Sequence, residues 1–141
     1  MSILQRSTIN SIHEINQIEN MLHDQSFDIE DIVFKNSILS IKFKKKCVNK
    51  KILKQFFFYK KIIIPYEKCF LNIYNVKDYK VIDSEKIGVY DFNSIDYLES
   101  KGKIIINTTI PIFFEIIVSK LEIEIVNTGI IIENKVKIKI F

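Results

Sequence analysis

The residues of this sequence best suited to chemistry are lysines gathered in one stretch with aromatic neighbours. Ten lysines and no acid lie between Ile32 and Tyr66, which leaves 11 of the 21 basic residues and all 17 acids elsewhere. Codon bias would scatter lysines along the chain, but it would not clear acids from one stretch. Lysines beside aromatic rings can hold a nucleic-acid backbone while the rings stack its bases. The expected binding patch consists of Lys42, Lys44, Lys45, Lys46, Lys50, Lys51, Lys54, Phe57, Tyr59, Lys60 and Lys61.

The same pattern also has a purely structural interpretation. Lysines that alternate with apolar residues are the ordinary outward face of a strand, and the aromatic residues would then fill the core. The net charge of +4 favours weak attraction to anions without naming a nucleic acid. If the patch does bind, we expect a protein with an acidic surface as its partner and keep nucleic acid as the alternative.

His23 and Asp24 are the second candidate. A His-Asp pair can ligate a metal or act as an oriented general base, but either role needs further ligands or a nucleophile. His13 is the only other histidine, and three glycines leave no phosphate-binding motif. The competing interpretation is helix-end chemistry, with the imidazole near the carbonyl end of a helix. We expect no enzyme, metal or cofactor, and keep an enzyme with a site near His23 and Asp24 as a further alternative.

A helix should lead into this pair. Apolar residues recur at spacings of three and four from Ile9 to Leu22, which predicts an amphipathic helix over these residues. Ser11 and Glu14 would form its capping box. We expect the helix to end between Leu22 and Asp24.

After the helix the apolar period changes to two, which predicts strands. Asn36 and Ser37 separate two such runs, 27–35 and 38–46, and predict a β-hairpin. A helical turn is expected at 94–100, ended by Gly102. Further strands are expected at 56–64, 68–76, 88–92, 103–109, 112–118, 121–126 and 130–140. If 121–126 and 130–140 are neighbours, the acids of the first would face the lysines of the second.

Length and composition predict a single domain over residues 1–141. The chain lacks alanine, the best helix former, and is rich in isoleucine and aromatic residues. We expect a mainly β (α+β) fold, with the helix followed by about eight antiparallel strands in a β-sandwich or curved sheet. Two cysteines, a polar N-terminus and no spanning stretch predict a cytoplasmic protein that does not enter a membrane. An isoleucine-rich strand edge could join two copies.

One short segment also carries a resemblance. Leu22-His23-Asp24, followed by Ile29, Ile32, Phe34, Leu39, Ile41 and Phe43, resembles the opening of small bacterial β-rich proteins of unknown function. Several such groups lie beside toxin genes and are regarded as immunity proteins. The resemblance covers a helix end and a hairpin and supplies no defined site residue. It implies a non-enzymatic protein that acts by binding, with an immunity-type role as one form of that function.

Overall fold

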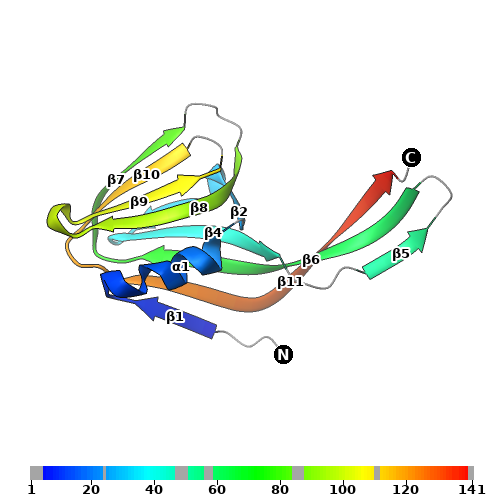
Figure 1. The fold of residues 1–141 in the computed structure, drawn as a ribbon, viewed down its shortest axis with the longest axis horizontal. Helices are drawn as coiled ribbons and strands as arrows, with labels where there is room; N and C mark the ends of the chain where they lie inside the picture. The colour runs from blue at the N-terminus through cyan, green and yellow to red at the C-terminus, as the bar shows by residue number, and fades with distance from the viewer. Residues whose placement is uncertain are drawn as a thin grey trace.

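The chain forms mainly antiparallel β structure with a short N-terminal α-helix, as the sequence predicts (Figure 1). The computed structural model describes residues 5–23, 25–46, 51–55, 59–83, 88–109 and 112–139. Within these ranges it describes the side chains of all residues except 5, 51–61 and 134–139. The elements are β1 (Gln5–Ile9), η1 (Ile12–Glu14), α1 (Ile15–Leu22), β2 (Ser26–Asp28), η2 (Ile29–Asp31), β3 (Ile32–Lys35), β4 (Ile38–Lys46), β5 (Lys51–Gln55), β6 (Tyr59–Ile73), β7 (Val76–Asp83), β8 (Val89–Leu98), η3 (Glu99–Lys101), β9 (Lys103–Thr108), β10 (Ile112–Val118) and β11 (Ile123–Lys139).

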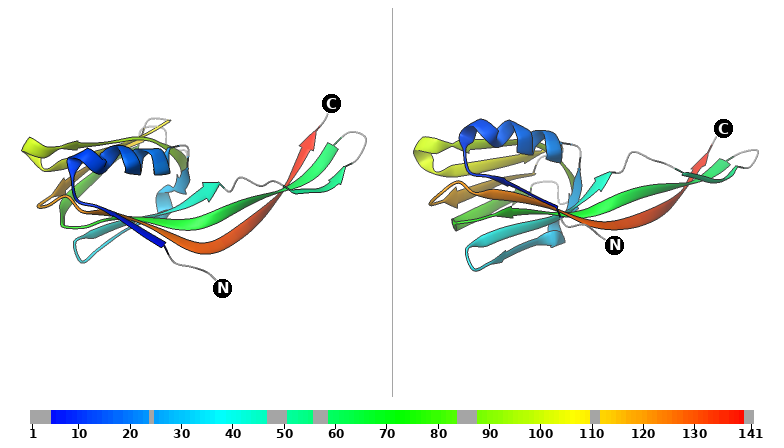
Figure 2. Two further views of the ribbon diagram at one scale, coloured as in Figure 1. Left: turned by 60° about the horizontal axis from the view of Figure 1, so that its bottom comes forward. Right: turned by 90° about the horizontal axis from the view of Figure 1, so that it is seen from below.

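The strands build one curved sheet. Its eleven strands follow the order β1-β11-β6-β4-β2-β8-β9-β10-β7, with β3 paired to β4 and β5 to β6. The short β2 forms the corner, because Ser26 pairs with Lys44 of β4 on one side and with Asp91 of β8 on the other. The sheet therefore folds back on itself, so that β8 and β9 lie across from β11 and β6 (Figure 2).

Rows of apolar side chains on the concave face form the core. One row consists of four buried residues, each paired with the next across neighbouring strands: Leu39 of β4, Ile73 of β6, Ile123 of β11 and Ile9 of β1. Ile15, Ile18 and Leu22 of α1 join the same cluster. Burying each such side chain contributes roughly 1.5–3 kcal/mol. The isoleucine-rich alternation thus specifies which face of each strand points inward.

Aromatic rings fill the corner of the sheet. The ring centre of Phe27 in β2 lies 4.6 Å from that of Phe92 and 5.8 Å from that of Phe114. Phe43 of β4 meets Phe92 edge to face, with centres 5.7 Å apart. These contacts join the two halves of the sheet at the point where β2 turns the corner.

An arm projects from this body (Figures 1 and 2). It consists of β5, residues 59–65 of β6 and residues 133–139 of β11, which pair with one another. The continuous buried cluster has no member among the described residues of the arm. Ile62 and Ile63 of the arm are buried as well, but they lie outside this cluster.

The helix is shorter than the sequence predicts. Residues 9–22 were expected to be helical, but α1 spans Ile15–Leu22 after the 3-10 turn η1, and Ile9 belongs to β1. Ile9 pairs with Ile123 and is buried in the core row, so the strand uses its side chain better than an extra helical turn would. Ser11 caps η1 by accepting a hydrogen bond from the backbone N of His13. The predicted end of the helix at Leu22 is confirmed.

Two pairs of predicted strands are in fact single strands. The segments 121–126 and 130–140 run together in β11, with a register shift between Asn127 and Ile131 and a positive φ of 75° at Gly129. Glycine here makes a bulge and no turn. The acids and lysines of these segments therefore lie along one strand, and the expected pairing between them is wrong.

The segments 56–64 and 68–76 likewise merge, because β6 runs through Pro65. Along one side of β6, β4 pairs with residues 66–73 and β5 with residues 60–63, so Pro65 falls in the interval without a partner. On that side proline interrupts no pairing of described residues, and on the other side it pairs with Glu133 of β11.

The middle of the chain contains more strand than expected. The helical turn predicted at 94–100 is limited to η3, and residues 89–98 form β8. Gly102 does end the turn, in a left-handed conformation. The strand β7, which pairs with β10, was not predicted, because the sequence pattern indicated a loop after residue 76. No helix in the described part of the chain is long and apolar enough to cross a membrane.

Candidate binding surface

The lysines of the predicted patch divide into two groups. Lys42, Lys44 and Lys46 occupy alternate positions of β4 and are exposed on the convex face, opposite the core. Lys45 has the opposite parity, is half-buried and pairs with Glu67 of β6. Three of the four β4 lysines in the expected patch therefore lie together on one exposed face.

The rest of the predicted patch lies in or beside the arm. Lys50 and Phe57 fall outside the described residues. The structure gives backbone positions for Lys51, Lys54, Tyr59, Lys60 and Lys61. In the ladder, Lys61 lies between Lys54 of β5 and Lys137 of β11. The arm therefore brings lysines from the middle and from the C-terminal part of the sequence onto neighbouring strands.

Aromatic residues do accompany the exposed lysines, but they are not those expected. Pairing of β4 with β6 places Phe70 opposite Lys42, Lys68 opposite Lys44 and Tyr66 opposite Lys46. Tyr66, Lys68 and Phe70 are half-buried. The convex side chains of the two strands form a surface that we call the lysine face: Lys42, Lys44, Lys46, Tyr66, Lys68 and Phe70.

A hollow of about 310 Å³ adjoins the lysine face. It is lined by Lys42 and Lys44 of β4, by Lys68 of β6, and by Asp28, Glu30 and Asp31 around η2. Asp31 Oδ1 lies 3.6 Å from Lys42 Nζ. Ser26, Phe27, Phe43, Val89 and Ile132 complete the lining. The hollow thus presents both signs of charge together with apolar side chains.

Exposed apolar side chains flank these charges. Val33 of β3 and Val89 of β8 are 57% and 55% exposed. Val33 and Phe70 line a second depression of about 280 Å³, which shares Glu30, Asp31 and Lys42 with the hollow. Apolar side chains ringed by charged ones are typical of surfaces that bind other proteins.

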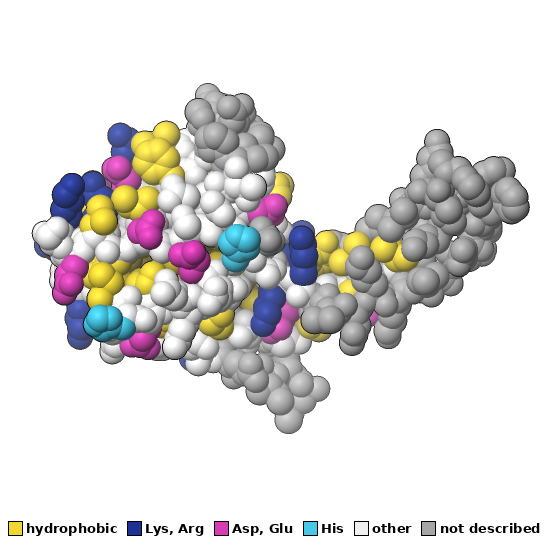
Figure 3. Space-filling model, viewed as in Figure 1, with side chains coloured by type: hydrophobic (Ala, Val, Ile, Leu, Met, Phe, Trp, Pro, Cys, Tyr) yellow, Lys and Arg dark blue, Asp and Glu magenta, His cyan; other side chains and the backbone are white. Residues whose placement is uncertain are grey.

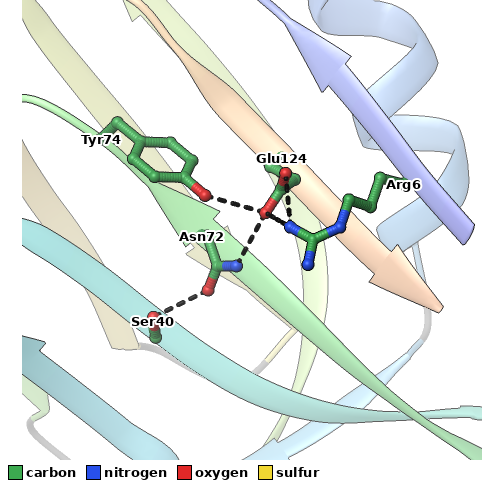
Figure 4. A network of polar contacts seen from close by, with 5 residues as sticks. All are labelled: Arg6, Ser40, Asn72, Tyr74 and Glu124. Atoms are coloured by element: carbon green, nitrogen blue, oxygen red, sulfur yellow. Dashed lines mark hydrogen bonds and ion pairs between the residues drawn. The ribbon is translucent and has the colours of Figure 1, made fainter. Parts of the chain in front are cut away.

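The convex face also carries a carboxylate network (Figure 4). Glu124 of β11 is 8% exposed. Its Oε1 accepts from Tyr74 OH at 2.8 Å and from Asn72 Nδ2 at 3.1 Å, and its Oε2 lies 3.2 Å from Arg6 Nη1. Ser40 Oγ donates to Asn72 Oδ1 at 2.7 Å. The network therefore links β1, β11, β6 and β4.

The network changes the acidity of its members. Burial raises the pKa of Glu124, but hydrogen bonds from Asn72, Tyr74 and Arg6 outweigh it, and the pKa lies below its usual value. Burial and then the hydrogen bond to Glu124 raise the pKa of Tyr74. Both shifts favour an ionised Glu124 beside a neutral Tyr74 near neutral pH.

The structure describes only His23 of the predicted His-Asp pair. His23 is the exposed C-cap residue of α1, where its backbone N donates to Glu19 O at 2.9 Å, and Asp24 lies outside the described residues. In the part of the chain that the structure describes, His, Cys, Asp and Glu side chains form no group of three suited to a metal ion.

The face that carries α1 differs from the lysine face. Figure 3 shows acidic and basic side chains interspersed over the body on this side. Such a mixed surface attracts neither anions nor cations strongly. We therefore take the lysine face as the candidate binding surface.

The sequence pattern missed half of the lysine face. Tyr66, Lys68 and Phe70 share one parity, and this alternation was visible in the sequence. Their pairing with Lys46, Lys44 and Lys42 was not, because residues 47–58 separate the two strands. The acids of η2 lie at this surface because β2 forms the corner of the sheet just before them. No periodicity in the sequence indicates that corner. No protein-family model, curated protein or solved structure matches this chain.

Proposed function

We propose that this protein is a non-enzymatic binding protein that uses the lysine face to bind an acidic surface of another protein. The observation that carries the proposal is the combination of exposed lysines, exposed apolar side chains and a hollow on one face of the sheet. Complementary charge guides the encounter of two proteins, and desolvated apolar contacts then hold them together.

A protein partner fits this surface better than a nucleic acid does. Asp28, Glu30 and Asp31 border the lysines, and these carboxylates would repel a phosphate backbone. Tyr66 and Phe70 are half-buried, which limits the ring surface on which a base could stack. A folded partner can place acids against the lysines and other groups against the carboxylates.

The immunity-type role expected from residues 22–43 is one form of this function. In that form the acidic partner is a toxin, and binding blocks its action. Co-expression of this protein with a toxin encoded beside it would test the role, since the toxin alone should arrest growth and this protein should restore it.

The experiment that tests the binding function compares charge reversals. The double variant Lys44→Glu/Lys46→Glu alters the lysine face, and Lys77→Glu/Lys101→Glu makes the same change in charge at exposed positions elsewhere. Each protein, immobilised, is exposed to a lysate of the native cell, with and without nuclease treatment. We expect one discrete acidic protein to be retained by the unaltered chain and by the control, and to be lost from the lysine-face variant.

Two results would contradict the proposal. Retention of the same protein by the lysine-face variant would show that another surface binds it. Recovery of nucleic acid that nuclease abolishes, with no discrete protein, would establish the nucleic-acid alternative instead. Thermal unfolding of both variants checks that the substitutions leave the fold intact.

A further inference from the structure

The hollow beside η2 is lined by two lysines of neighbouring strands. Lys44 and Lys68 occupy paired positions on β4 and β6 and both line the hollow. Among the described residues, neither ammonium group forms an ion pair. Like charges directly opposite each other in a sheet are unfavourable, and half-burial of Lys68 increases the cost. An anion placed between them would remove this repulsion.

The three acids that line the hollow are not equivalent. Asp28 Oδ1 accepts from Glu30 N at 3.1 Å, and Asp31 Oδ2 accepts from Asp28 N at 3.2 Å. Asp31 also pairs with Lys42. These two carboxylates are therefore committed to the capping box of η2. The Glu30 side chain is exposed and forms no hydrogen bond or ion pair with any described residue.

We propose that the hollow binds two neighbouring, opposite charges of the partner: a carboxylate between Lys44 and Lys68, and a lysine or arginine side chain against Glu30. This inference rests on the proposed function, because it specifies the chemistry of the same surface. Val89 and Ile132, which also line the hollow, reduce the water around the carboxylate and so strengthen its attraction to the lysines.

The two-charge arrangement makes a prediction that a simple anion site does not make. If the partner presents only negative charge, Glu30 opposes binding and its reversal to lysine should strengthen it. If the partner presents a cation beside its carboxylate, the same reversal removes an attraction and adds a repulsion. The sign of the effect of Glu30→Lys therefore separates the two arrangements.

The test uses three labelled probes of equal length: a peptide of repeating Glu-Glu-Lys-Lys, polyglutamate and single-stranded DNA. Binding is measured by fluorescence anisotropy at low and high salt. We expect Glu30→Lys to weaken the mixed peptide roughly tenfold and to strengthen both polyanions. Glu99→Lys, a matched reversal of an exposed acid in η3, should change none of them.

Lys68→Gln supplies a second, independent variant. It should weaken the mixed peptide and polyglutamate several-fold, because one of the two opposed cations is gone. It should also keep or raise the unfolding temperature, since it relieves the repulsion from Lys44. A lysine with a merely structural role would instead lower the unfolding temperature when replaced.

The inference is overturned if Glu30→Lys leaves binding of the mixed peptide unchanged or strengthens it. That outcome is distinct from failure of the proposed function, which is decided by whether Lys44→Glu/Lys46→Glu loses the protein retained from the lysate. Loss in that experiment, together with an unaffected mixed peptide here, would leave the binding function in place and remove only the two-charge arrangement.

Discussion

Glu124 shows how a single side chain can link folding to pH. Its carboxylate is nearly buried on the convex face, and hydrogen bonds lower its pKa in the folded chain in spite of burial. A carboxyl group with a lower pKa when folded than when unfolded stabilises the fold at pH values above the unfolded-state pKa. This contribution is lost as the pH falls through the folded-state pKa.

Replacement of Glu124 with Gln is expected to lower the free energy of unfolding by about 1–3 kcal/mol near neutral pH, because three charge-assisted contacts weaken. The difference between the two proteins should shrink as the pH falls below the usual pKa of glutamate, 4.5. Urea unfolding at a series of pH values measures it. Glu99→Gln removes an exposed acid and serves as the control, and a difference that stays constant with pH would contradict the account.

The β3-β4 hairpin is an element that the sequence predicted correctly. Its two turn residues, Asn36 and Ser37, have φ values of 54° and 62°, as a two-residue type I′ turn requires. Asparagine tolerates this conformation better than serine does, and glycine suits it best. The hairpin therefore retains local strain at Ser37.

Replacement of Ser37 with Gly is expected to raise the free energy of unfolding by about 0.5–1 kcal/mol, because the turn becomes Asn-Gly and the left-handed strain is relieved. Chemical denaturation measures the change. Ser100→Gly is the matched control at an exposed residue without a positive φ, where glycine should destabilise instead. If both variants shifted stability in the same direction, the turn assignment would be in error.

Gly102, between η3 and β9, is a further residue in the left-handed conformation. Its φ is 56°, and a Cβ there would lie 2.9 Å from the carbonyl oxygen of Val118. The Val118 N also donates to Gly102 O at 2.9 Å, so the two chain segments cannot separate without losing that bond. Gly102→Ala should therefore lower the free energy of unfolding by about 1–3 kcal/mol, measured by denaturation beside Ser100→Ala. An unchanged stability would show that the β9-β10 region moves easily.

At the scale of the whole molecule, body and arm are built differently. The continuous core draws on both halves of the sheet and on α1, and none of its members lies in the described part of the arm. The exposed lysines of β4 and the hollow belong to the body. The body should therefore fold and bind without the arm.

A chain in which Asn-Gly joins Lys46 directly to Tyr66, and which ends after Glu133, tests this separation. Lys46 and Tyr66 are paired neighbours on antiparallel strands, so a two-residue turn can connect them. We expect β-type circular dichroism and a cooperative thermal transition to be kept. Loss of cooperative unfolding would show that the arm supports the body. Sedimentation of both forms tests whether two copies of the chain join. If the arm joins them, the shortened chain should sediment as a monomer.

Local patterns in the sequence determined the local structure. The period of two predicted most of the strands, and Asn36-Ser37 predicted the hairpin. The apolar spacing from Ile9 to Leu22 predicted a helix, which the structure has at Ile15–Leu22. These features depend on residues a few positions apart, whose preferences act within one element. Ile9 was misassigned because its environment is set by Ile123, far along the chain.

What the sequence alone determined about this protein is its mainly β class, the inward face of most strands and the segregation of its lysines. The tertiary structure decided which strands are neighbours, and so placed Lys68 opposite Lys44 and the acids of η2 beside both. The physical reason is that strand pairing over long separations is chosen by burial of the whole core. No local preference records that choice, so the surface that pairing assembles becomes visible only in the folded molecule.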